Sequence, residues 1–251
     1  MRRFRITLLA TITEFLLVMA VVQVAFAQSR PSISQTTLEE PNQKTAEIST
    51  EELKKILADR SEPVLDVRSA IEFAIAHITG SINVYEKEVE RVVQLSPDKA
   101  ARITLYCNGP FCGKSKRLSE QLLKFGYTNI RRYQLGLPVW RALGNTVQTD
   151  LEGFRYVIQK DRTAVFVDAR SKTEFMKQSV PGAVNVHLGE AEKANEDGRL
   201  PYHDKGTRVI VFANSADEAR AVAEEIAWKA YWNSSYFGGS FNELQVARLW
   251  R

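Results

Sequence analysis

The sequence of 251 residues predicts two consecutive α/β domains, each with a mostly parallel central sheet flanked by helices. The first observation is an internal repeat at a constant offset of 102 residues: VLDVRS at 64–69 recurs as FVDARS at 166–171, and ITGSINV at 78–84 recurs as VPGAVNV at 180–186. The second observation is that short apolar, β-branched segments alternate with segments of helical periodicity in each copy. A repeat this long indicates two domains and not a solenoid of small units.

The elements of the first copy follow from capping and periodicity. Ser49 or Thr50 begins a capping box ahead of a helix, and Leu118 and Leu122 share one face of a later helix. We expect strands at 63–67, 103–106 and 130–133, and helices at 51–58, 70–76, 115–125 and 138–143. The second copy is expected to repeat this order, with strands near 165–167, 209–212 and 235–237. The predicted domains occupy residues 48–147 and 153–247.

Residues 1–27 have the composition of an export signal. Three arginines within the first five residues precede an apolar run at 6–27, which ends in Ala25-Phe26-Ala27, a small-x-small cleavage pattern. We expect cleavage after Ala27. The alternative is an uncleaved membrane anchor, which Glu14 would disfavour by roughly 2.5–3.5 kcal/mol. In either case the folded part is expected to be exported, to the periplasm, soluble or tethered. The following stretch, 28–47, is rich in Ser, Thr, Gln and Pro and is expected to be a flexible spacer.

The charge balance gives no indication of a nucleic-acid partner. The formal net charge is +4. Removing residues 1–27 takes away three of the 34 basic and one of the 30 acidic residues, so 31 and 29 remain and the net charge falls to +2. No cluster of Lys and Arg in the remainder has the extent of a phosphate-backbone contact surface. We expect no nucleic acid, and a membrane only if the N-terminal segment is uncleaved.

Cys107 and Cys112 are the two cysteines of the chain and lie five positions apart in one predicted loop. A disulfide framework would show several spread pairs, so local chemistry is favoured. Cys107 follows a buried strand, and the loop at 108–114 contains two glycines and a proline, so backbone amides can turn inward beside a helix N-terminus. Such an anion site would lower the pKa of the thiol and stabilise a thiolate or persulfide. The alternative is that Cys107 is a small buried hydrophobic residue.

The first copy resembles the rhodanese superfamily of sulfurtransferases. The blocks that carry the resemblance are DVRS, EF, HITGSIN, LYC, GYTN, and Gly136 with Trp140, and they span nearly all of residues 48–145. The resemblance implies that Cys107 takes sulfane sulfur from a small anionic donor such as thiosulfate, as a persulfide, and passes it to a thiol or other thiophilic acceptor. It implies no cofactor.

The resemblance also assigns roles to neighbouring residues. The substrate-binding loop would consist of Asn108, Gly109, Pro110, Phe111, Gly113, Lys114 and Ser115. Asp66 and Arg68 would form a structural ion pair at a strand end, and His77 would order a loop. Three cations beyond the loop are expected to attract an anionic donor: Lys114, Lys116 and Arg117. No metal site is expected, because His187 and His203 have no partners at ligand spacing.

The loop departs from the family pattern at one position. Most active members have an arginine five residues after the cysteine, and this chain has Cys112 there. The chain thus resembles a Cys-x4-Cys variant, and the choice of donor is open. Cys112 is either a resolving thiol or disulfide partner of Cys107, or a passive loop residue.

The second copy is expected to be catalytically inactive. Aligning its strand at 209–212 with the strand at 103–106 places Ala213 where Cys107 stands. Asp217 and Glu218 then occupy the place of the anion cradle.

Three functions therefore remain open. The first is an exported sulfurtransferase that uses Cys107, the second a dithiol redox or persulfide-handling protein that uses both cysteines, and the third a non-catalytic binding module. A phosphatase is disfavoured because no arginine occurs between Cys107 and Ser115. The four tryptophans are expected to pack in the cores or between the domains: Trp140, Trp228, Trp232 and Trp250.

Overall fold

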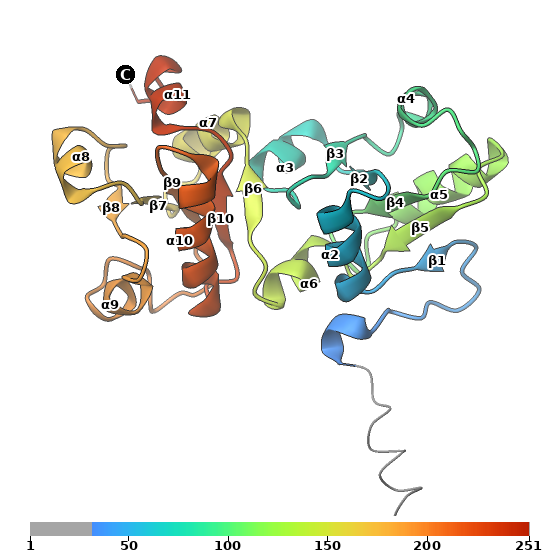
Figure 1. Ribbon diagram of the computed structural model, residues 1–251, viewed down its shortest axis with the longest axis horizontal. Helices are drawn as coiled ribbons and strands as arrows, with labels where there is room; N and C mark the ends of the chain where they lie inside the picture. Colours follow the sequence, from blue (N-terminus) through green and yellow to red (C-terminus); the bar gives the residue numbers. More distant parts are fainter. Residues whose placement is uncertain (1–31, 251) are drawn as a thin grey trace, which may run out of the picture. The chain divides into compact units, whose positions relative to one another are not determined.

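The computed structural model describes residues 32–250 (Figure 1). The expected signal or anchor at 1–27 lies outside the described residues. The chain divides after Thr36. A short 3₁₀ turn, η1 (Ile33–Gln35), belongs to the preceding unit, and the residues from Thr37 onward form one compact unit that contains both sheets.

The first sheet has five parallel strands in the order β1-β5-β4-β2-β3 (Figure 1). The strands are β1 (Ala46–Glu47), β2 (Val64–Asp66), β3 (Ile82–Asn83), β4 (Ile103–Tyr106) and β5 (Ile130–Tyr133). The accompanying helices are α2 (Thr50–Asp59), α3 (Ala70–Ile75), α4 (Val89–Leu95), α5 (Lys114–Lys124) and α6 (Gly136–Ala142). Because successive side chains of a strand point to opposite faces, the residues of β4 divide between two hydrophobic cores. Leu105 packs with Leu118 of α5, and Tyr106 packs with Trp140 of α6.

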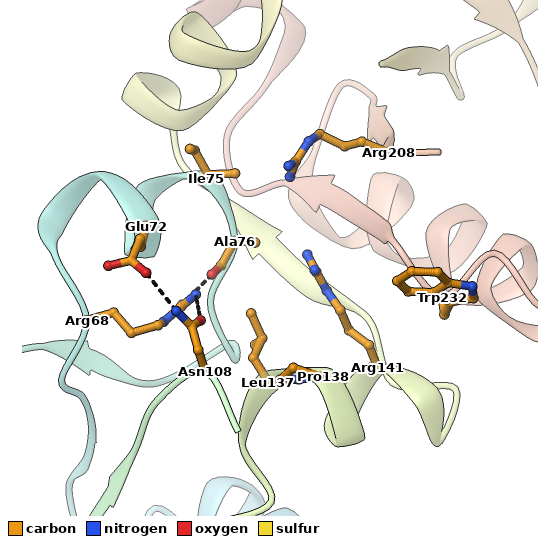
Figure 2. Close-up of a pocket in the computed structure, with 10 residues that line it drawn as sticks. All are labelled: Arg68, Glu72, Ile75, Ala76, Asn108, Leu137, Pro138, Arg141, Arg208 and Trp232. Carbon is orange, nitrogen blue, oxygen red and sulfur yellow. Dashed lines mark hydrogen bonds between the residues drawn. The ribbon is translucent and has the colours of Figure 1, made fainter. Parts of the chain in front are cut away.

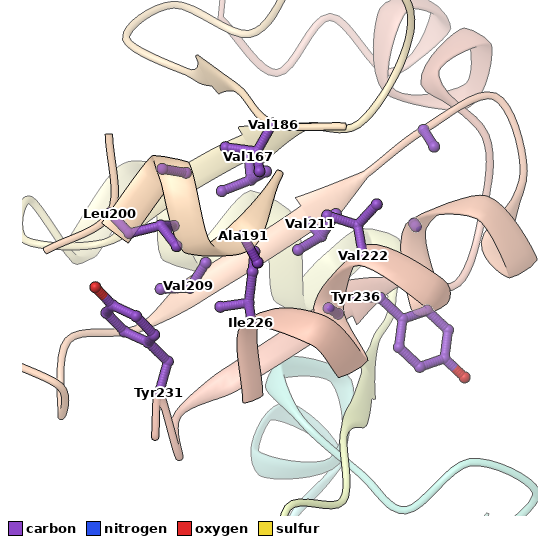
Figure 3. Close-up of a cluster of buried hydrophobic side chains, with 14 residues drawn as sticks. Val167, Val186, Ala191, Leu200, Val209, Val211, Val222, Ile226, Tyr231 and Tyr236 are labelled. Carbon is purple, nitrogen blue, oxygen red and sulfur yellow. The ribbon is translucent and has the colours of Figure 1, made fainter. Parts of the chain in front are cut away.

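The second sheet repeats this topology with five parallel strands in the order β6-β10-β9-β7-β8. The strands are β6 (Val147–Thr149), β7 (Val165–Asp168), β8 (Val184–Asn185), β9 (Val209–Phe212) and β10 (Ser234–Phe237). The helices are α7 (Leu151–Lys160), α8 (Lys172–Lys177), α9 (Ala191–Glu196), α10 (Ala216–Trp228) and α11 (Phe241–Val246). One face of its core is built mostly from Val and Ala around Val209, Val211 and Ile226 (Figure 3). The prediction of two α/β domains with mostly parallel sheets is confirmed.

The edges of the domains differ from the expected boundaries. Ala46 and Glu47, assigned to the spacer, form β1 beside β5. Val147, assigned to the first domain, begins β6 of the second sheet. Residues 38–47 are tied to the first domain and are not a free spacer, because Thr45 is buried and the backbone N–H groups of Leu38 and Glu39 donate to the carboxylate of Glu47. Strands of two or three residues carry too little periodicity to be recognised in the sequence.

The two domains meet where α3 and α7 cross. His77 and Gln148 exchange backbone hydrogen bonds of 2.9 and 2.8 Å, and the hydroxyl of Thr149 donates to the carbonyl of Ile75 at 2.8 Å. At Gly153 in α7, an added Cβ would lie 1.9 Å from the carbonyl oxygen of Ala74. The helices therefore touch backbone to backbone, and only glycine fits at this position.

None of the helices within residues 32–250 combines the length and the apolar character that a membrane crossing requires.

We predict that Gly153→Ala destabilises the protein by roughly 1–3 kcal/mol or more, because a methyl group must push α7 away from α3. Urea unfolding followed by circular dichroism measures the change. Glu152→Ala, at the adjacent and exposed position of the same helix, is the matched control and should stay within about 0.5 kcal/mol of wild type. Equal stability of the two variants would contradict the close helix crossing.

Candidate active site

Cys107 lies directly after β4 and is buried, with 1% of its surface exposed. Its Sγ donates to the carbonyl oxygen of Cys112 at 3.3 Å and lies 3.5 Å from the hydroxyl oxygen of Ser115. Both cysteines are free thiols. Six residues, 108–113, connect Cys107 to α5 and fold over the sulfur, while Phe111 at the tip of this loop is fully exposed. The structure thus brings Cys107, Cys112 and Ser115 together, as a site built on the loop requires.

The electrostatics of Cys107 are opposite to the expectation. Burial and, after it, the Cys112 side chain raise the pKa of the Cys107 thiol to about 11, because the hydrogen bonds from the side chain and backbone of Ser115, which lower the pKa, offset them only in part. The prediction that inward amides and the helix N-terminus lower this pKa is wrong for the closed loop. The reason is that the loop closes over the sulfur and presents the Cys112 carbonyl, which binds the protonated thiol.

The turn between β5 and α6 supports the loop from behind. Gly136 has a φ of +65°, and an added Cβ would lie 2.3 Å from the backbone N of Gly109 and 2.6 Å from the carbonyl oxygen of Cys107. The N–H of Leu137 donates to the same carbonyl at 3.1 Å. The amide of Gln134 donates to the carbonyl of Pro110 at 3.0 Å and accepts from the hydroxyl of Ser115 at 3.2 Å. The backbone position of Cys107 is therefore fixed by a segment about thirty residues later in the chain.

A buried arginine extends this network to the N-terminal segment. Arg132 of β5 has 1% of its surface exposed. It donates to the side-chain oxygen of Gln134 and, at 2.8 Å, to the hydroxyl oxygen of Thr45. The carboxylates of Glu40 and Glu47 lie 3.2 and 3.6 Å from its Nη2. Gln134 and Arg132 were not among the residues predicted for the site. The available signal was an arginine inside a short segment otherwise expected to be a buried strand.

Asp66 and Arg68 form a buried ion pair at the end of β2. The Nε of Arg68 donates to the Asp66 carboxylate at 2.9 Å, and its Nη1 donates to Asn108 Oδ1 at 3.2 Å. Its Nη2 also donates to the carbonyl of Ala76. Burial lowers the pKa of Arg68, but the hydrogen bond and the charge of Asp66 outweigh it and raise the pKa overall. The pair reaches the site through Asn108, the residue that follows Cys107.

The cations expected to attract an anionic donor are all paired with carboxylates. Lys114 lies 3.1 Å from Glu72, Lys116 lies 3.9 Å from Glu40, and Arg117 lies 2.7 Å from Glu86. Burial raises the pKa of Glu72, but hydrogen bonds from Ser69, Asn108 and Lys114 outweigh it and lower the pKa to about 2. In the closed loop the three cations are therefore each offset by a carboxylate, and their attraction of an anionic donor stays a prediction. These partners lie 31 or more residues away in sequence and were not identifiable from local pattern.

His77 lies at the domain junction, apart from the polar contacts of Cys107. Its ring stacks on Phe73 with centroids 3.8 Å apart, and Nδ1 lies 3.0 Å from the carbonyl oxygen of Phe73. Burial lowers the pKa of His77, against the opposing charge of Asp150.

No cluster of metal-ligating side chains occurs within residues 32–250. Of the tryptophans, Trp140 is buried, whereas Trp228 and Trp232 are 77% and 54% exposed, which contradicts the expectation that they are packed.

The second domain has the same ion pair and Asn–Glu hydrogen bond as the first domain, but it lacks the cysteine loop. Asp168 and Arg170 repeat the ion pair, and Asn214 donates to Glu174 at 2.8 Å as Asn108 donates to Glu72 at 2.7 Å. Ala213 takes the place of Cys107. Its carbonyl accepts from the N–H of Phe241 at 2.8 Å. Two residues, 214–215, connect Ala213 to α10, where six connect Cys107 to α5. This domain therefore has neither the sulfur nor the loop to enclose one.

We predict that Gly136→Ala is more damaging than Gly144→Ala. Both glycines have positive φ values, +65° and +78°, so both variants carry the backbone strain of about 1 kcal/mol. Only Gly136 faces the cysteine loop, whereas nothing lies within 4 Å of a Cβ at Gly144. Gly136→Ala should lose roughly 1–3 kcal/mol more in urea unfolding. Equal losses would show that the loop does not rest on Gly136.

We predict that Cys107 is alkylated slowly at neutral pH. Only the thiolate reacts, so with a pKa of about 11 the rate should rise about tenfold per pH unit through pH 10 without a plateau. An ordinary cysteine, with a pKa of about 8.5, would level off before that. Iodoacetamide labelling of Cys112→Ser, read by mass spectrometry, measures Cys107 alone and keeps burial, the largest cause of its raised pKa, and Cys107→Ser is the control. A plateau below pH 9 would contradict the closed loop.

Several solved structures show limited likeness to this chain. A thiosulfate sulfurtransferase from Pseudomonas aeruginosa is 21% identical, with a TM-score of 0.38, over 80% of this chain and 42% of that protein. This chain therefore spans less than half of that protein's length. A rhodanese with anions from E. coli is 34% identical, with a TM-score of 0.27, over 29% of this chain and 85% of that protein. A protein from Bacillus halodurans is 19% identical, with a TM-score of 0.38, over 43% of this chain and 77% of that protein.

The family assignment rests on the sequence of the two domains. None of the curated proteins compared with the chain matches it. The family model for the Rhodanese-like domain matches twice, at residues 49–143 and 156–247, which is more than half of the chain. Each match contains four of the five strands of one sheet, and the first strands, β1 and β6, lie just before the matched residues. The resemblance inferred from the sequence blocks is confirmed: the chain belongs to the rhodanese-like family and carries two such domains in tandem.

Proposed function

We propose that this protein is a sulfurtransferase in which Cys107 of the first domain carries sulfane sulfur as a persulfide. The observation that supports this most directly is the contrast between the domains. The first encloses a cysteine in a six-residue loop with the Ser115 hydroxyl 3.5 Å from the sulfur, and the second has Ala213 and a two-residue turn on the same frame. Membership of the rhodanese-like family agrees with this chemistry.

The proposed transfer has two steps. The Cys107 thiolate attacks the outer sulfur of thiosulfate or a related donor, the sulfur–sulfur bond of the donor breaks, and sulfite leaves with the electron pair. An acceptor, a thiolate or cyanide, then attacks the outer sulfur of the persulfide, and the Cys107 thiolate leaves. The backbone N–H of Ser115, at the start of α5, can donate to the charged sulfur in both states. The Ser115 hydroxyl can do so when its single proton turns from Gln134 to the sulfur.

The closed loop must open before the first step. At a pKa of about 11, the thiolate fraction at pH 7 is on the order of one in ten thousand. Movement of 108–113 that separates Cys107 Sγ from the Cys112 carbonyl removes the bond to the protonated thiol and exposes the sulfur. The same movement would release Lys114 from Glu72 and leave a cation beside an anionic donor. Loop opening therefore links access, charge and nucleophilicity.

A second candidate is a dithiol persulfide reductase. Cys112 lies in the same hydrophobic cluster as Cys107, and its side chain already influences the pKa of Cys107. In this scheme the Cys112 thiolate attacks the inner sulfur of the Cys107 persulfide, a Cys107–Cys112 disulfide forms, and hydrosulfide leaves. An external dithiol would then be needed to reduce the disulfide in each cycle.

We also propose that the protein works outside the cytosol. The support is the basic start, the apolar run at 6–27 and the Ala25-Phe26-Ala27 pattern. In such an oxidising compartment, burial of Cys107 would protect the resting thiol from oxidation.

The decisive experiment is intact-protein mass spectrometry of the full chain before and after thiosulfate, together with thiosulfate:cyanide transfer. We predict a gain of one sulfur atom on Cys107 in wild type and Cys112→Ser, and none in Cys107→Ser, whose transfer activity should fall to background. Cys107→Ser combined with Ala213→Cys is the matched control. It should stay inactive because the second domain has no cysteine loop.

Each other outcome has a definite meaning. A disulfide-linked wild type that releases hydrosulfide only with a reductant, and only with both cysteines, would favour the dithiol reductase. No sulfur on Cys107 from any sulfane donor, in the reduced protein, would sink both enzymatic proposals and leave a binding module.

A further inference from the structure

A cavity of about 340 Å³ lies between the two domains, beside the frame of the cysteine site (Figure 2). Residues of both domains line it: Arg68, Glu72, Ile75, Ala76, Asn108, Leu137, Pro138 and Arg141 from the first, and Arg208 and Trp232 from the second. Its volume is within the range of small-molecule sites, and its position between domains is a common one for such sites.

Arg141 is the unusual residue of this cavity. It lies in the last turn of α6, and its side chain points into the space between the domains (Figure 2). Its Nε and Nη2 atoms are buried and have no hydrogen-bond partner within residues 32–250. A buried guanidinium without a partner is destabilising, and buried charges in proteins are normally paired. Because Arg141 lines the cavity and two of its donor atoms have no partner, its side chain is the place in the cavity where an outside acceptor is most needed.

A second arginine approaches from the other domain. The guanidinium groups of Arg141 and Arg208 point toward one another across the cavity in Figure 2. Burial, together with the charges of Arg208 and Arg68, lowers the pKa of Arg141 to about 9, so Arg141 is still a cation at neutral pH. Arg208 lies 3.2 Å from Asp161, which pairs it on one side only. The charge of Arg208 disfavours the charged form of Arg141, so the two guanidinium groups repel.

The other charged groups of the cavity are already engaged. Arg68 is satisfied by Asp66, Ala76 and Asn108. Glu72 faces the cavity but accepts from Asn108 and Lys114, at 2.7 and 3.1 Å, and does not reach Arg141 as a partner. The uncompensated charge of the cavity is therefore positive and is concentrated at Arg141.

The rest of the wall is apolar. Ile75, Leu137 and Pro138 lie on the first-domain side, and the partly exposed ring of Trp232 lies on the other. This combination of a cationic end and an apolar wall matches a molecule with one acidic group and a short apolar body. A planar carboxylate fits the fork of a guanidinium better than a spherical anion does.

We propose that this cavity is a binding site for a small organic carboxylate, whose acidic group is held by Arg141 and Arg208 and whose apolar part packs against Leu137 and Trp232. The site uses no atom of Cys107, so it stands whether or not the protein transfers sulfur. Because its ligand touches both domains, binding holds them together.

The experiment titrates the full chain with sodium benzoate at constant ionic strength and follows the thermal midpoint and tryptophan fluorescence. Benzamide, which has the same shape and no charge, and sulfate, which has charge and no apolar body, are the ligand controls. We predict that benzoate raises the midpoint of wild type, with a dissociation constant in the millimolar range usual for so small a ligand, about 10⁻³ M. Benzamide and sulfate should give smaller shifts.

Arg141→Gln should bind benzoate at least about tenfold more weakly, as the loss of a hydrogen bond to a charged group implies. Without ligand its midpoint should be no lower than that of wild type, because the substitution removes an unpaired charge. Arg155→Gln, at a half-buried arginine of α7 that does not line the cavity, is the matched control and should bind as wild type does. Arg208→Gln tests the same site from the second domain should Arg141→Gln not fold.

Three results would overturn the proposal. The first is no benzoate response in wild type. The second is an equal response to benzamide or sulfate. The third is benzoate binding by Arg141→Gln and Arg208→Gln that is as strong as binding by wild type.

Discussion

The buried ion pair of Asp66 and Arg68 is the interaction on which the first domain is organised. It stands where β2 ends, and the guanidinium of Arg68 reaches both the carbonyl of Ala76 after α3 and the side chain of Asn108 after β4. Three separate chain segments therefore meet on one cation. Removing either partner of such a pair typically costs 3–5 kcal/mol, because the other charge is left buried and uncompensated. The cysteine loop starts from a point that this pair holds in place.

The tandem arrangement provides an internal comparison of what belongs to the fold and what belongs to the chemistry. Features present in both domains are structural. One is the ion pair, which Asp168 and Arg170 repeat in the second domain. The other is the side-chain amide of Asn83, or of Asn185 in the second domain, which donates to two backbone carbonyls beside the ion pair. Features confined to the first domain are the loop at 108–113, the Ser115 hydroxyl and the Gln134 bridge. They all surround the sulfur of Cys107. Because an α/β fold alone does not determine function, these features carry the functional argument.

The sequence was sufficient for the fold because the repeat placed the same pattern twice at one offset, and because the central strands are apolar throughout. It also located Cys107 at a strand end next to a helix start. It was insufficient for the state of that cysteine, since the direction of the pKa shift depends on which carbonyl the loop presents to the sulfur. The pairing of Lys114 with Glu72 and the position of Arg141 depend on tertiary packing across 42 residues or between domains. The short edge strands β1 and β6 exist through their partners and have no pattern of their own.

The attachment of residues 38–47 affects the order in which the first domain can be completed. Thr45 and Glu47 contact Arg132, and β1 pairs with β5. The two residues joined by the Thr45–Arg132 hydrogen bond are 87 positions apart in the chain. A chain that emerges from its N-terminus presents this segment first, yet the segment has nothing to join until β5 has been added beside β4. The earliest part of the domain to be synthesised is thus among the last to dock, because it can dock only after β5 has been synthesised. Contacts with this large a sequence separation slow folding through the entropy of loop closure, so the polar network behind Ser115 is assembled only in the final stage.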